Sequence, residues 1–288
     1  MTGAPLLELQ AVDHVFADGS AGLRSCDLRL GRGRRHALLG ANGAGKTTVL
    51  QHLNGLLRPT SGRVLWEGRP VEYGRKDLAA LRRHVGLVFQ NPDRQLFSAQ
   101  VEEDVSFGPL NLGLDEATVR ARVAAALDAV DMAAHARHAV HHLSFGQKKR
   151  VCLAGVLAME PDVLLLDEPM AGLDAAMQAD LALLLDRLAA RGVTIVLTTH
   201  DIDFAYGWAD DIHLMAGGRC NASGPAATLA RQGDLLHAAG QRLPLALELH
   251  AQLAAHGVLP ADAAPRSVGA VLDALQALPL AHPGRTNT

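Results

Sequence analysis

Alternating and continuous hydrophobic stretches divide the chain into a predicted series of strands. Apolar and polar residues roughly alternate over residues 6–16 and 23–30, on either side of the turn pair Asp18-Gly19, which predicts two half-buried antiparallel strands. Short continuous apolar runs have the length and composition of fully buried strands. These runs lie at residues 37–39, 85–89, 163–166 and 193–197. We therefore expect an N-terminal antiparallel sheet beside a buried sheet.

Helical spacing of apolar residues predicts the helices that connect and follow these strands. The predicted spans are 46–57, 115–130, 144–159, 175–190, 244–256 and 267–278. A hairpin is expected over residues 63–73, with its turn at Glu67-Gly68. Because helical patterns dominate residues 91–160, this section is predicted to be a helical insertion. The last two helices are predicted to form a small C-terminal appendage, which is either a dimer contact or a helical cover for one sheet face.

A phosphate-binding pattern, G-x-x-x-x-G-K-[ST], follows the first buried run at residues 40–47. Its glycines leave backbone N–H groups free to surround an anion, and the next helix points its positive end at the same place. Lys46 is expected to reach the β- and γ-phosphates, and the Thr47 hydroxyl to ligate Mg²⁺. The loop predicts that the protein binds a nucleoside triphosphate, but it does not distinguish a kinase from a GTPase or a transport ATPase. An accidental glycine-rich turn is the alternative.

Polar residues at the carboxyl ends of the buried runs are the next candidates for chemistry. Asp167 and Glu168 follow residues 163–166, and two adjacent carboxylates left unpaired there would be costly, which points to a cation. Asp167 is expected to hold Mg²⁺ and Glu168 to polarise a water for attack; a surface acid pair is the alternative. Gln90 and His200 end two other runs, where ligands sit in open α/β sheets, although a lone histidine is more often structural.

Three further features each have a functional and an ordinary interpretation. Ser144 and Gln147 form a capping-box pattern, which either starts a helix or presents a hydroxyl and a positive helix end to a phosphate. Phe16 either stacks on a purine ring or fills the core. A group of histidines either binds a metal or lies in a solvated loop. That group is His135, His138, His141 and His142.

Bulk composition excludes several classes of protein. Hydrophobic residues make up 49% of the 288 residues and charged residues 20%, as in ordinary globular proteins. The formal net charge of -3 gives no reason to expect a nucleic-acid partner. No stretch approaches the ~20 apolar residues that span a bilayer, so membrane association is expected only through a partner. Three widely spaced cysteines suggest neither a disulfide framework nor a zinc site, and fit a reducing cytosol.

Taken in chain order, these elements resemble the complete set found in ATP-binding-cassette (ABC) ATPases. The matching elements are residues 40–47, Gln90, 143–147, 164–168, 171–174 and His200, and the resemblance covers residues of about 6 to 225. It implies an α/β fold: a P-loop NTPase (RecA-like) core with an N-terminal antiparallel β-sheet and an inserted α-helical subdomain over about 91–160. Residues 1–225 would then form the ATPase domain and 226–288 a C-terminal helical extension.

The resemblance also implies a role for each candidate residue. Glu168, His200 and Gln90 would be catalytic, with Phe16 stacking on adenine and Mg²⁺ held by Thr47, Gln90 and Asp167. The loop residues that would bind ATP are Gly40, Ala41, Asn42, Gly43, Ala44, Gly45, Lys46, Thr47 and Thr48. In a head-to-tail dimer, one subunit would complete the other's ATP site with Ser144, Gly146, Gln147 and Asp174.

Within this family, residues 86–97, 101–105 and 107–113 look like the ATPases of energy-coupling-factor importers, and residues 141–150 are most similar to the cobalt branch. This implies an ATP-hydrolysing subunit with ATP and Mg²⁺ as cofactors, in a homodimer or a heterodimer with a second ABC ATPase. It would sit peripherally on the cytoplasmic face of the cell membrane, against an integral transmembrane (T) component and a substrate-binding (S) component, without nucleic acid. Motion would pass to the membrane partner through residues 90–111.

Other functions remain open at this point. A nickel or vitamin importer would need the same ATPase, a soluble ABC protein without a transporter is a more distant possibility, and a P-loop kinase more distant still. The chain also departs from the family pattern. The departures are Ala41 for proline, Phe145 for glycine, Met170 for threonine, and Arg94 where an acid is common.

Overall fold

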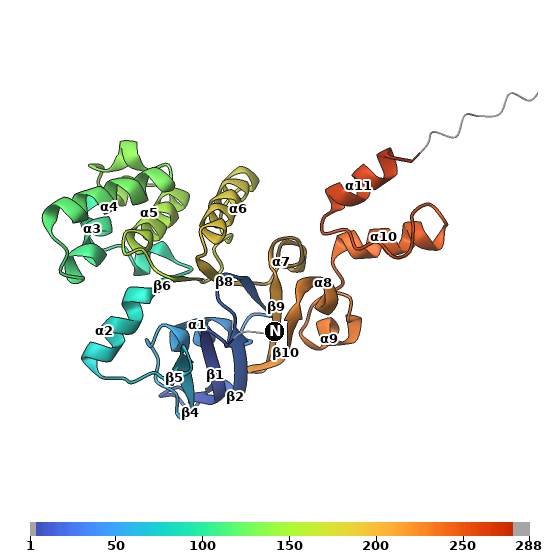
Figure 1. Ribbon diagram of the computed structural model, residues 1–288, viewed down its shortest axis with the longest axis horizontal. Coiled ribbons are helices and arrows are strands. Elements are labelled where there is room, and N and C mark those ends of the chain that lie inside the picture. Colours follow the sequence, from blue (N-terminus) through green and yellow to red (C-terminus); the bar gives the residue numbers. More distant parts are fainter. Residues whose placement is uncertain (1–3, 279–288) are drawn as a thin grey trace, which may run out of the picture.

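An antiparallel sheet and a larger, mostly parallel sheet form the centre of the protein in a computed structural model that describes residues 4–278 (Figure 1). The antiparallel sheet has the strand order β2-β1-β4-β5. Its strands are β1 (Leu7–Val15), β2 (Ala21–Leu30), β4 (Ser61–Trp66) and β5 (Arg69–Pro70). In β2 the buried positions include Leu23, Cys26, Leu28 and Leu30, which pack inward while most residues between them face water. The alternating pattern therefore predicted β1 and β2 correctly, and β4 and β5 lie in the predicted hairpin region.

The second sheet has the order β10-β9-β3-β8-β7-β6, and all its neighbouring pairs are parallel except β9 with β10. Its strands are β3 (Arg35–Leu39), β6 (Val85–Val88), β7 (Val163–Leu166), β8 (Thr194–Thr199), β9 (Asp211–Ala216) and β10 (Arg219–Pro225). Four of these were predicted as buried runs; β9 and β10 were not. Because parallel strands end at one edge, Gly40, Asp167 and His200 come to lie along the same edge.

Helices surround the parallel sheet and form a separate lobe. Around the sheets lie α1 (Lys46–Leu53), α2 (Arg75–His84), α6 (Ala175–Ala190), α7 (Ile202–Trp208), α8 (Ala226–Leu229) and α9 (Gly233–Ala238). The helical lobe, green in Figure 1, contains α3 (Val101–Asn111), α4 (Glu116–Ala129) and α5 (Phe145–Leu157). The short 3₁₀ helices Pro92–Arg94, Ala133–His135 and Val140–His142 belong to this section too. This lobe is the helical insertion that was predicted for residues 91–160.

One predicted helix needs a correction at its end, and helices α2, α3 and α7 were not among the predicted spans. The helix predicted over 46–57 ends at Leu53, because Gly55 adopts a left-handed conformation with φ +69° that breaks the helical path although the leucine spacing continues. No helix was predicted over α2, where Leu81 is the buried residue and most other side chains are exposed. Most residues of α2 are charged or polar, so few apolar side chains mark it as a helix in the sequence.

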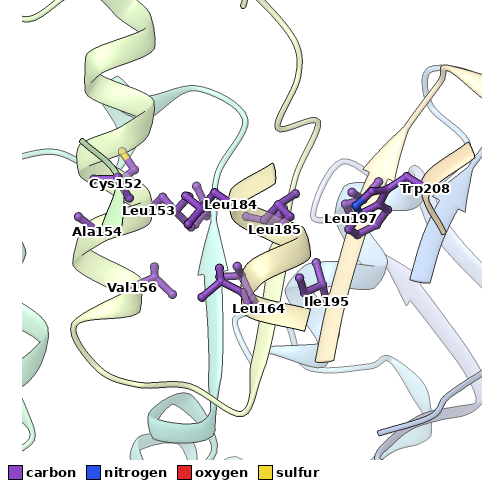
Figure 2. Packing of buried hydrophobic residues seen from close by; sticks show 14 of the residues in the cluster. Cys152, Leu153, Ala154, Val156, Leu164, Leu184, Leu185, Ile195, Leu197 and Trp208 are labelled. Carbon is purple, nitrogen blue, oxygen red and sulfur yellow. The ribbon is translucent and has the colours of Figure 1, made fainter. Parts of the chain in front are cut away.

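One continuous hydrophobic cluster joins the helical lobe to the parallel sheet. Figure 2 shows Val156 of α5 directed toward Leu164 of β7 and Leu153 toward Leu184 of α6, with side chains of β8 beyond them. Fully burying a side chain of this size stabilises a fold by about 1.5–3 kcal/mol. The cluster therefore packs α5, whose first turn carries several candidate residues, against the parallel sheet. A second cluster fills the space between the two sheets and α1.

A C-terminal hairpin of two helices, α10 (Leu245–Ala255) and α11 (Val268–Gln276), has its own small core. Figure 1 shows it extending from the body beyond α7. Helices α8 and α9, by contrast, contribute Ala226, Leu229 and Leu236 to the main cluster. We therefore propose that the predicted C-terminal extension begins near Pro244 and not at residue 226. Its predicted residues 279–288 lie outside the described part of the chain.

Two arginines attach this hairpin to α7. The Arg242 guanidinium pairs with the Asp203 carboxylate, whose other oxygen accepts a hydrogen bond from the Leu245 backbone N–H at 2.6 Å. The Arg266 guanidinium donates to the Ala209 carbonyl oxygen at 2.6 Å and lies 5.1 Å from the centre of the Tyr206 ring. Over residues 4–278, none of the helices has both the length and the apolar character to span a membrane.

Candidate functional site

The loop at residues 40–47 connects β3 to α1, the strand-loop-helix arrangement that a phosphate-binding loop requires. Gly43 and Gly45 have φ +79° and +97°, a region that other residues rarely adopt. A Cβ on Gly40 would lie 2.3 Å from the Met215 carbonyl oxygen, so no side chain fits between the loop and β9. The glycines therefore allow a tight loop directly before the N-terminus of α1.

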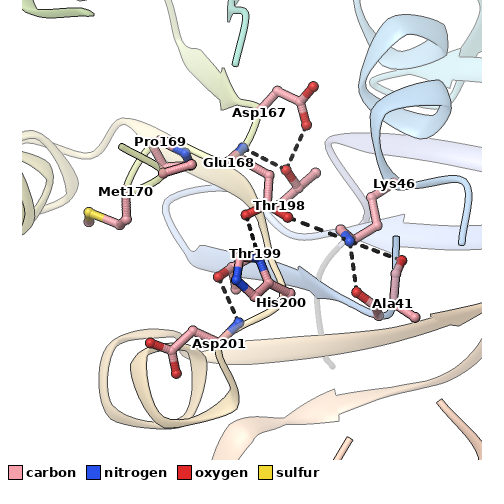
Figure 3. A network of polar contacts seen from close by, with 12 residues as sticks. Ala41, Lys46, Asp167, Glu168, Pro169, Met170, Thr198, Thr199, His200 and Asp201 are labelled. Atoms are coloured by element: carbon pink, nitrogen blue, oxygen red, sulfur yellow. Dashed lines mark hydrogen bonds and ion pairs between the residues drawn. The ribbon is translucent and has the colours of Figure 1, made fainter. Parts of the chain in front are cut away.

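Lys46 lies across this loop and is almost fully buried. Its ammonium donates to the carbonyl oxygens of Gly40 at 2.7 Å and Ala41 at 3.2 Å, and lies 3.5 Å from the Glu168 carboxylate (Figure 3). A buried cation at a glycine-rich loop and a helix N-terminus makes a strongly positive site, which suits the terminal phosphates of a nucleotide.

Asp167 is buried and meets two hydroxyl groups. The Thr47 hydroxyl donates to it at 2.9 Å, and the Thr198 hydroxyl donates to Oδ1 at 2.7 Å. A carboxylate beside a threonine hydroxyl is an oxygen pair of the kind that Mg²⁺ prefers, so Thr47 and Asp167 fit the predicted metal role. Gln90 is exposed just beyond the end of β6, next to β7 in the sheet, and so lies at the same edge.

The Glu168 carboxylate lies between two groups that can respond to a bound phosphate. One oxygen faces the Lys46 ammonium, and the other is 3.1 Å from Nδ1 of His200. The carboxylate is only 12% exposed whereas the His200 side chain is 66% exposed, so the histidine can reach solvent or a ligand. Glu168 and His200 are therefore brought together as predicted, while the chemical role of each remains a prediction.

The backbone of Glu168 is held in an unusual conformation. Its φ of +44° is uncommon for a residue with a side chain and costs on the order of 1–3 kcal/mol unless the surroundings enforce it. The Glu168 N–H donates to the Thr198 hydroxyl at 2.8 Å, and the Lys149 ammonium donates to the Glu168 carbonyl oxygen at 3.3 Å. Neither partner could be identified from the sequence, because Thr198 has the pattern of an ordinary strand residue and Lys149 that of a charged residue on a helix surface.

The residues predicted to act on a partner's nucleotide stand apart from the loop. Ser144 caps α5 through a reciprocal capping box with Gln147, and Asp174 caps α6 by accepting from the Met177 N–H at 2.8 Å. Within the described residues, no hydrogen bond joins Ser144, Gly146 or Gln147 to residues 40–48. Their places at the starts of α5 and α6 are compatible with the predicted action across a dimer.

Phe16 is more than a third exposed at the end of β1, so it is not a core phenylalanine. Its ring meets the edge of His14 at 4.7 Å and lies so close to Gly22 that a Cβ there would come within 2.7 Å of the ring. Gly22 therefore leaves room for the ring to pack against β2. Stacking of Phe16 on adenine stays a prediction.

The four histidines after α4 do not form a ligand cluster. The rings of His135 and His138 are 5.0 Å apart, and Nε2 of His135 lies 3.2 Å from Nε2 of Gln147. His141 and His142 are exposed. The described part of the chain contains no group of three or more His, Cys, Asp or Glu side chains placed to hold a metal ion. His138 is exposed like His141 and His142, as in a solvated loop, whereas His135 is partly buried against Gln147.

A groove of about 550 Å³ separates α2 from the helical lobe. Its wall includes Leu87, Phe89, Phe97, Phe107 and Met159, and Arg82 and Arg83 of α2 also line it. Phe97 and Phe107 are 64% and 51% exposed and meet edge to face at 4.7 Å. An exposed aromatic pair of this size beside a groove is typical of a surface that binds another protein.

Known proteins resemble this chain over most of its length. Residues 23–171 match the family described as ABC transporter. The cobalt import ATP-binding protein CbiO of Rhodobacter capsulatus is 49% identical over 245 residues, which is 85% of this chain and 88% of that protein. The energy-coupling factor transporter ATP-binding protein EcfA of Methanocaldococcus jannaschii is 45% identical over 239 residues, 83% of this chain and 86% of that protein.

Solved structures agree with these relatives. The structure of CbiO1 from Clostridium perfringens, described as part of the ABC transporter complex CbiONQ, superposes with a TM-score of 0.72 at 40% identity and covers 82% of this chain and 94% of that one. A dimeric ATP-binding cassette in a post-hydrolysis state with ADP and Pi gives a TM-score of 0.70 at 26% identity, covering 76% and 98%.

Proposed function

The chain belongs to the ABC transporter family, as an ATP-hydrolysing subunit of the energy-coupling-factor type, and from this premise we propose that it drives the import of cobalt ions through a membrane partner. The observation that carries the catalytic part is the Glu168 carboxylate, held between the Lys46 ammonium and the His200 ring beside Asp167. The observation that favours cobalt is the 49% identity to a cobalt import ATP-binding protein.

In this proposal the loop N–H groups and Lys46 bind the β- and γ-phosphates of ATP, while Thr47, Asp167 and Gln90 hold Mg²⁺. The metal would neutralise charge on the phosphates. Glu168 orients and polarises the attacking water, because its carboxylate accepts no hydrogen bond from Thr47 or Thr198, the two hydroxyl groups that occupy Asp167, and lies beside Lys46 and His200. His200, within hydrogen-bond distance of Glu168 and largely exposed, contacts the γ-phosphate.

We further propose that two ATPase subunits close over the nucleotide, as a homodimer or with a second ABC ATPase. Ser144, Gly146 and Gln147 at the start of α5 and Asp174 at the start of α6 would complete the partner's site. Their positions at two helix N-termini support this role, since helix N-termini attract phosphate. A dimer held together by ATP would close with substrate and open after hydrolysis.

The groove beside Phe97 and Phe107 is the proposed contact with the transmembrane (T) component, which would itself hold the substrate-binding (S) component. Its apolar wall and exposed aromatic rings fit a short amphipathic helix. This contact would place the protein peripherally on the cytoplasmic face of the membrane. Arg82 and Arg83 line the groove, and Arg94 lies exposed in the segment that leads from β6 to α3, so an acidic residue on the docking segment would be favoured here.

A matched pair of variants tests the catalytic proposal. Glu168→Gln removes the carboxylate, and we expect kcat to fall about a hundredfold or more while ATP stays bound and the dimer stays closed in size-exclusion chromatography. Glu160→Gln is the control, because Glu160 also has a positive φ, +53°, but pairs with Arg122 at the surface. Undiminished hydrolysis by Glu168→Gln would count against the proposal.

Cobalt transport requires a separate test. Detergent extracts of cells that express the tagged protein should yield an integral membrane protein, and cobalt uptake should depend on this chain and on Glu168. Uptake of nickel or of a vitamin in place of cobalt would identify another importer with the same ATPase. Recovery of no membrane protein would favour a soluble ABC ATPase.

A further inference from the structure

Lys149 of α5 is a buried cation that is not among the residues assigned above to ATP or Mg²⁺. Only 8% of it is exposed. Its ammonium donates to the carbonyl oxygens of Ala171 at 2.6 Å, Pro169 at 2.9 Å and Glu168 at 3.3 Å. An ammonium has three N–H donors, so each donor has one carbonyl acceptor. One side chain thus fixes most of the segment that follows β7.

Phe145 covers this lysine. Its ring centre is 5.4 Å from the Lys149 ammonium, and a Cβ on Gly172 would come within 2.8 Å of the ring, so the ring packs against the same segment. Burial lowers the pKa of Lys149 to about 8, with the carboxylates of Glu168 and Asp167 and the Cys152 thiol acting in the opposite direction.

Burying this cation is costly, since among residues 4–278 it pairs with no carboxylate, and carbonyl oxygens replace its water. A neutral side chain of similar length would fill the space without that cost. The three hydrogen bonds therefore indicate that Lys149 serves to hold the backbone of residues 168–171 in a particular conformation. The peptide groups on both sides of Glu168 are held, the N–H by Thr198 and the carbonyl by Lys149, and these bonds fix its φ of +44°.

We propose, resting on the proposed function, that Lys149 is a positioning residue that couples the two nucleotide sites of the dimer. It lies one turn from the start of α5, where Ser144 and Gln147 would meet the partner's ATP. It also holds residues 168–171, and Glu168 in this segment would act on the ATP bound by the same subunit. A shift of α5 on contact with the partner's nucleotide therefore moves the Glu168 carboxylate relative to Lys46 and His200.

The neighbouring Lys148 is a natural control. It lies on the same helix and its ammonium pairs with the Asp93 carboxylate at 2.7 Å, away from residues 168–171. Both lysines can be replaced by glutamine in the full-length protein. Lys149→Arg supplies the conservative variant, because a guanidinium has five donors and keeps its charge.

The test measures kcat and KM for ATP in these variants, together with thermal unfolding. For Lys149→Gln we expect kcat to fall about tenfold or more and KM to stay within about twofold, since the variant alters a contact to the catalytic segment and not to ATP. Lys149→Arg should recover at least about half of the wild-type kcat, and Lys148→Gln should match the wild type. A merely structural lysine would lower the unfolding temperature without this split between kcat and KM.

The inference is overturned if Lys149→Gln has the kcat of Lys148→Gln, or if Lys149→Arg is as defective as Lys149→Gln. Where Lys149→Gln yields no folded protein, Lys149→Arg decides: a kcat near the wild type supports the three-carbonyl contact, and a loss of about tenfold refutes it. Absence of ATP hydrolysis in the wild type would refute the proposed function instead. The two failures are therefore distinguishable.

Discussion

Replacing Thr198 by valine isolates the bonds that hold the two acidic residues in place. The Thr198 side chain is fully buried on β8, and its hydroxyl donates to Oδ1 of Asp167 at 2.7 Å and accepts the Glu168 N–H at 2.8 Å. Valine has nearly the same shape without the hydroxyl. Both partners therefore lose a hydrogen bond at a place where no water can take over without displacing protein.

The expected loss of stability follows from these two bonds. A hydrogen bond to a charged group contributes about 1.5–3 kcal/mol, and a buried N–H left without an acceptor costs about 1–3 kcal/mol. Asp167 keeps its bond from Thr47, so we take the lower part of both ranges and expect a loss of about 3 kcal/mol in the free energy of unfolding. For a chain of this size that lowers the melting temperature by roughly 6–12 °C.

The assay is thermal unfolding of the full-length protein at neutral pH without nucleotide, followed by circular dichroism. Thr199→Val is the matched control on the same strand, because the Thr199 hydroxyl accepts a single bond, from the Asp201 N–H at 3.1 Å. We expect it to lose about 1 kcal/mol, or roughly 2–4 °C. Thr198→Ser should restore most of the melting temperature, since it returns the hydroxyl.

ATP hydrolysis provides a second measurement on the same variants. Thr198→Val should lower kcat as well, because the strained backbone of Glu168 loses the acceptor of its N–H. If Thr198→Val melts within about 2 °C of Thr199→Val, the hydroxyl does not have the energetic role that its two short bonds indicate, and the reasoning is refuted.

Two further predictions concern β9 and its neighbours. Gly40→Ala should destabilise the protein by about 1–3 kcal/mol and abolish nucleotide binding, measured by calorimetry with ATP, because its Cβ would lie 2.3 Å from the Met215 carbonyl oxygen; normal ATP affinity would disprove this. Burial lowers the pKa of both His36 and His213 below 6.5. In acid the unfolded chain therefore binds more protons than the folded chain. The stability that is present above about pH 6.5 is accordingly lost as the pH falls below this value. The melting temperature should drop over the first pH unit below 6.5, less steeply in His213→Gln, and a flat profile would contradict the prediction.

The strands that could be predicted from the sequence are those that consist mainly of apolar residues. The runs at β3, β6, β7 and β8 were identified because their inward and outward faces are both covered. Strand β9 was missed because it buries Asp211 and His213, whose partners Arg34 and His36 lie 177 positions earlier in the chain. Such long-range pairing leaves no local pattern from which a strand could be read.

The same limit applies to the site. Lys46, Asp167 and Glu168 were identified from the glycine loop and from their place at a strand end, whereas the role of His200 was assigned only through the family resemblance. The structure places Lys46, Glu168 and His200 together. Thr198 could not be identified, because its hydroxyl acts through contacts with residues about 30 positions away that appear only in the sheet. The sequence therefore predicted the acidic pair Asp167 and Glu168, but not the residues that hold this pair in place.

The arginine bonds between the C-terminal hairpin and α7 bear on how the protein can be shortened in the laboratory. Helix α7 starts two residues after His200, and its Asp203 anchors both Arg242 and the first turn of α10. A fragment that ends at residue 225 would lose this support. It would also lose Leu229 and Leu236, so the part of the main core that they cover would be exposed to water. A minimal catalytic fragment should accordingly retain the chain through the end of α11, because Val271 completes the hairpin core, and affinity tags belong beyond residue 278.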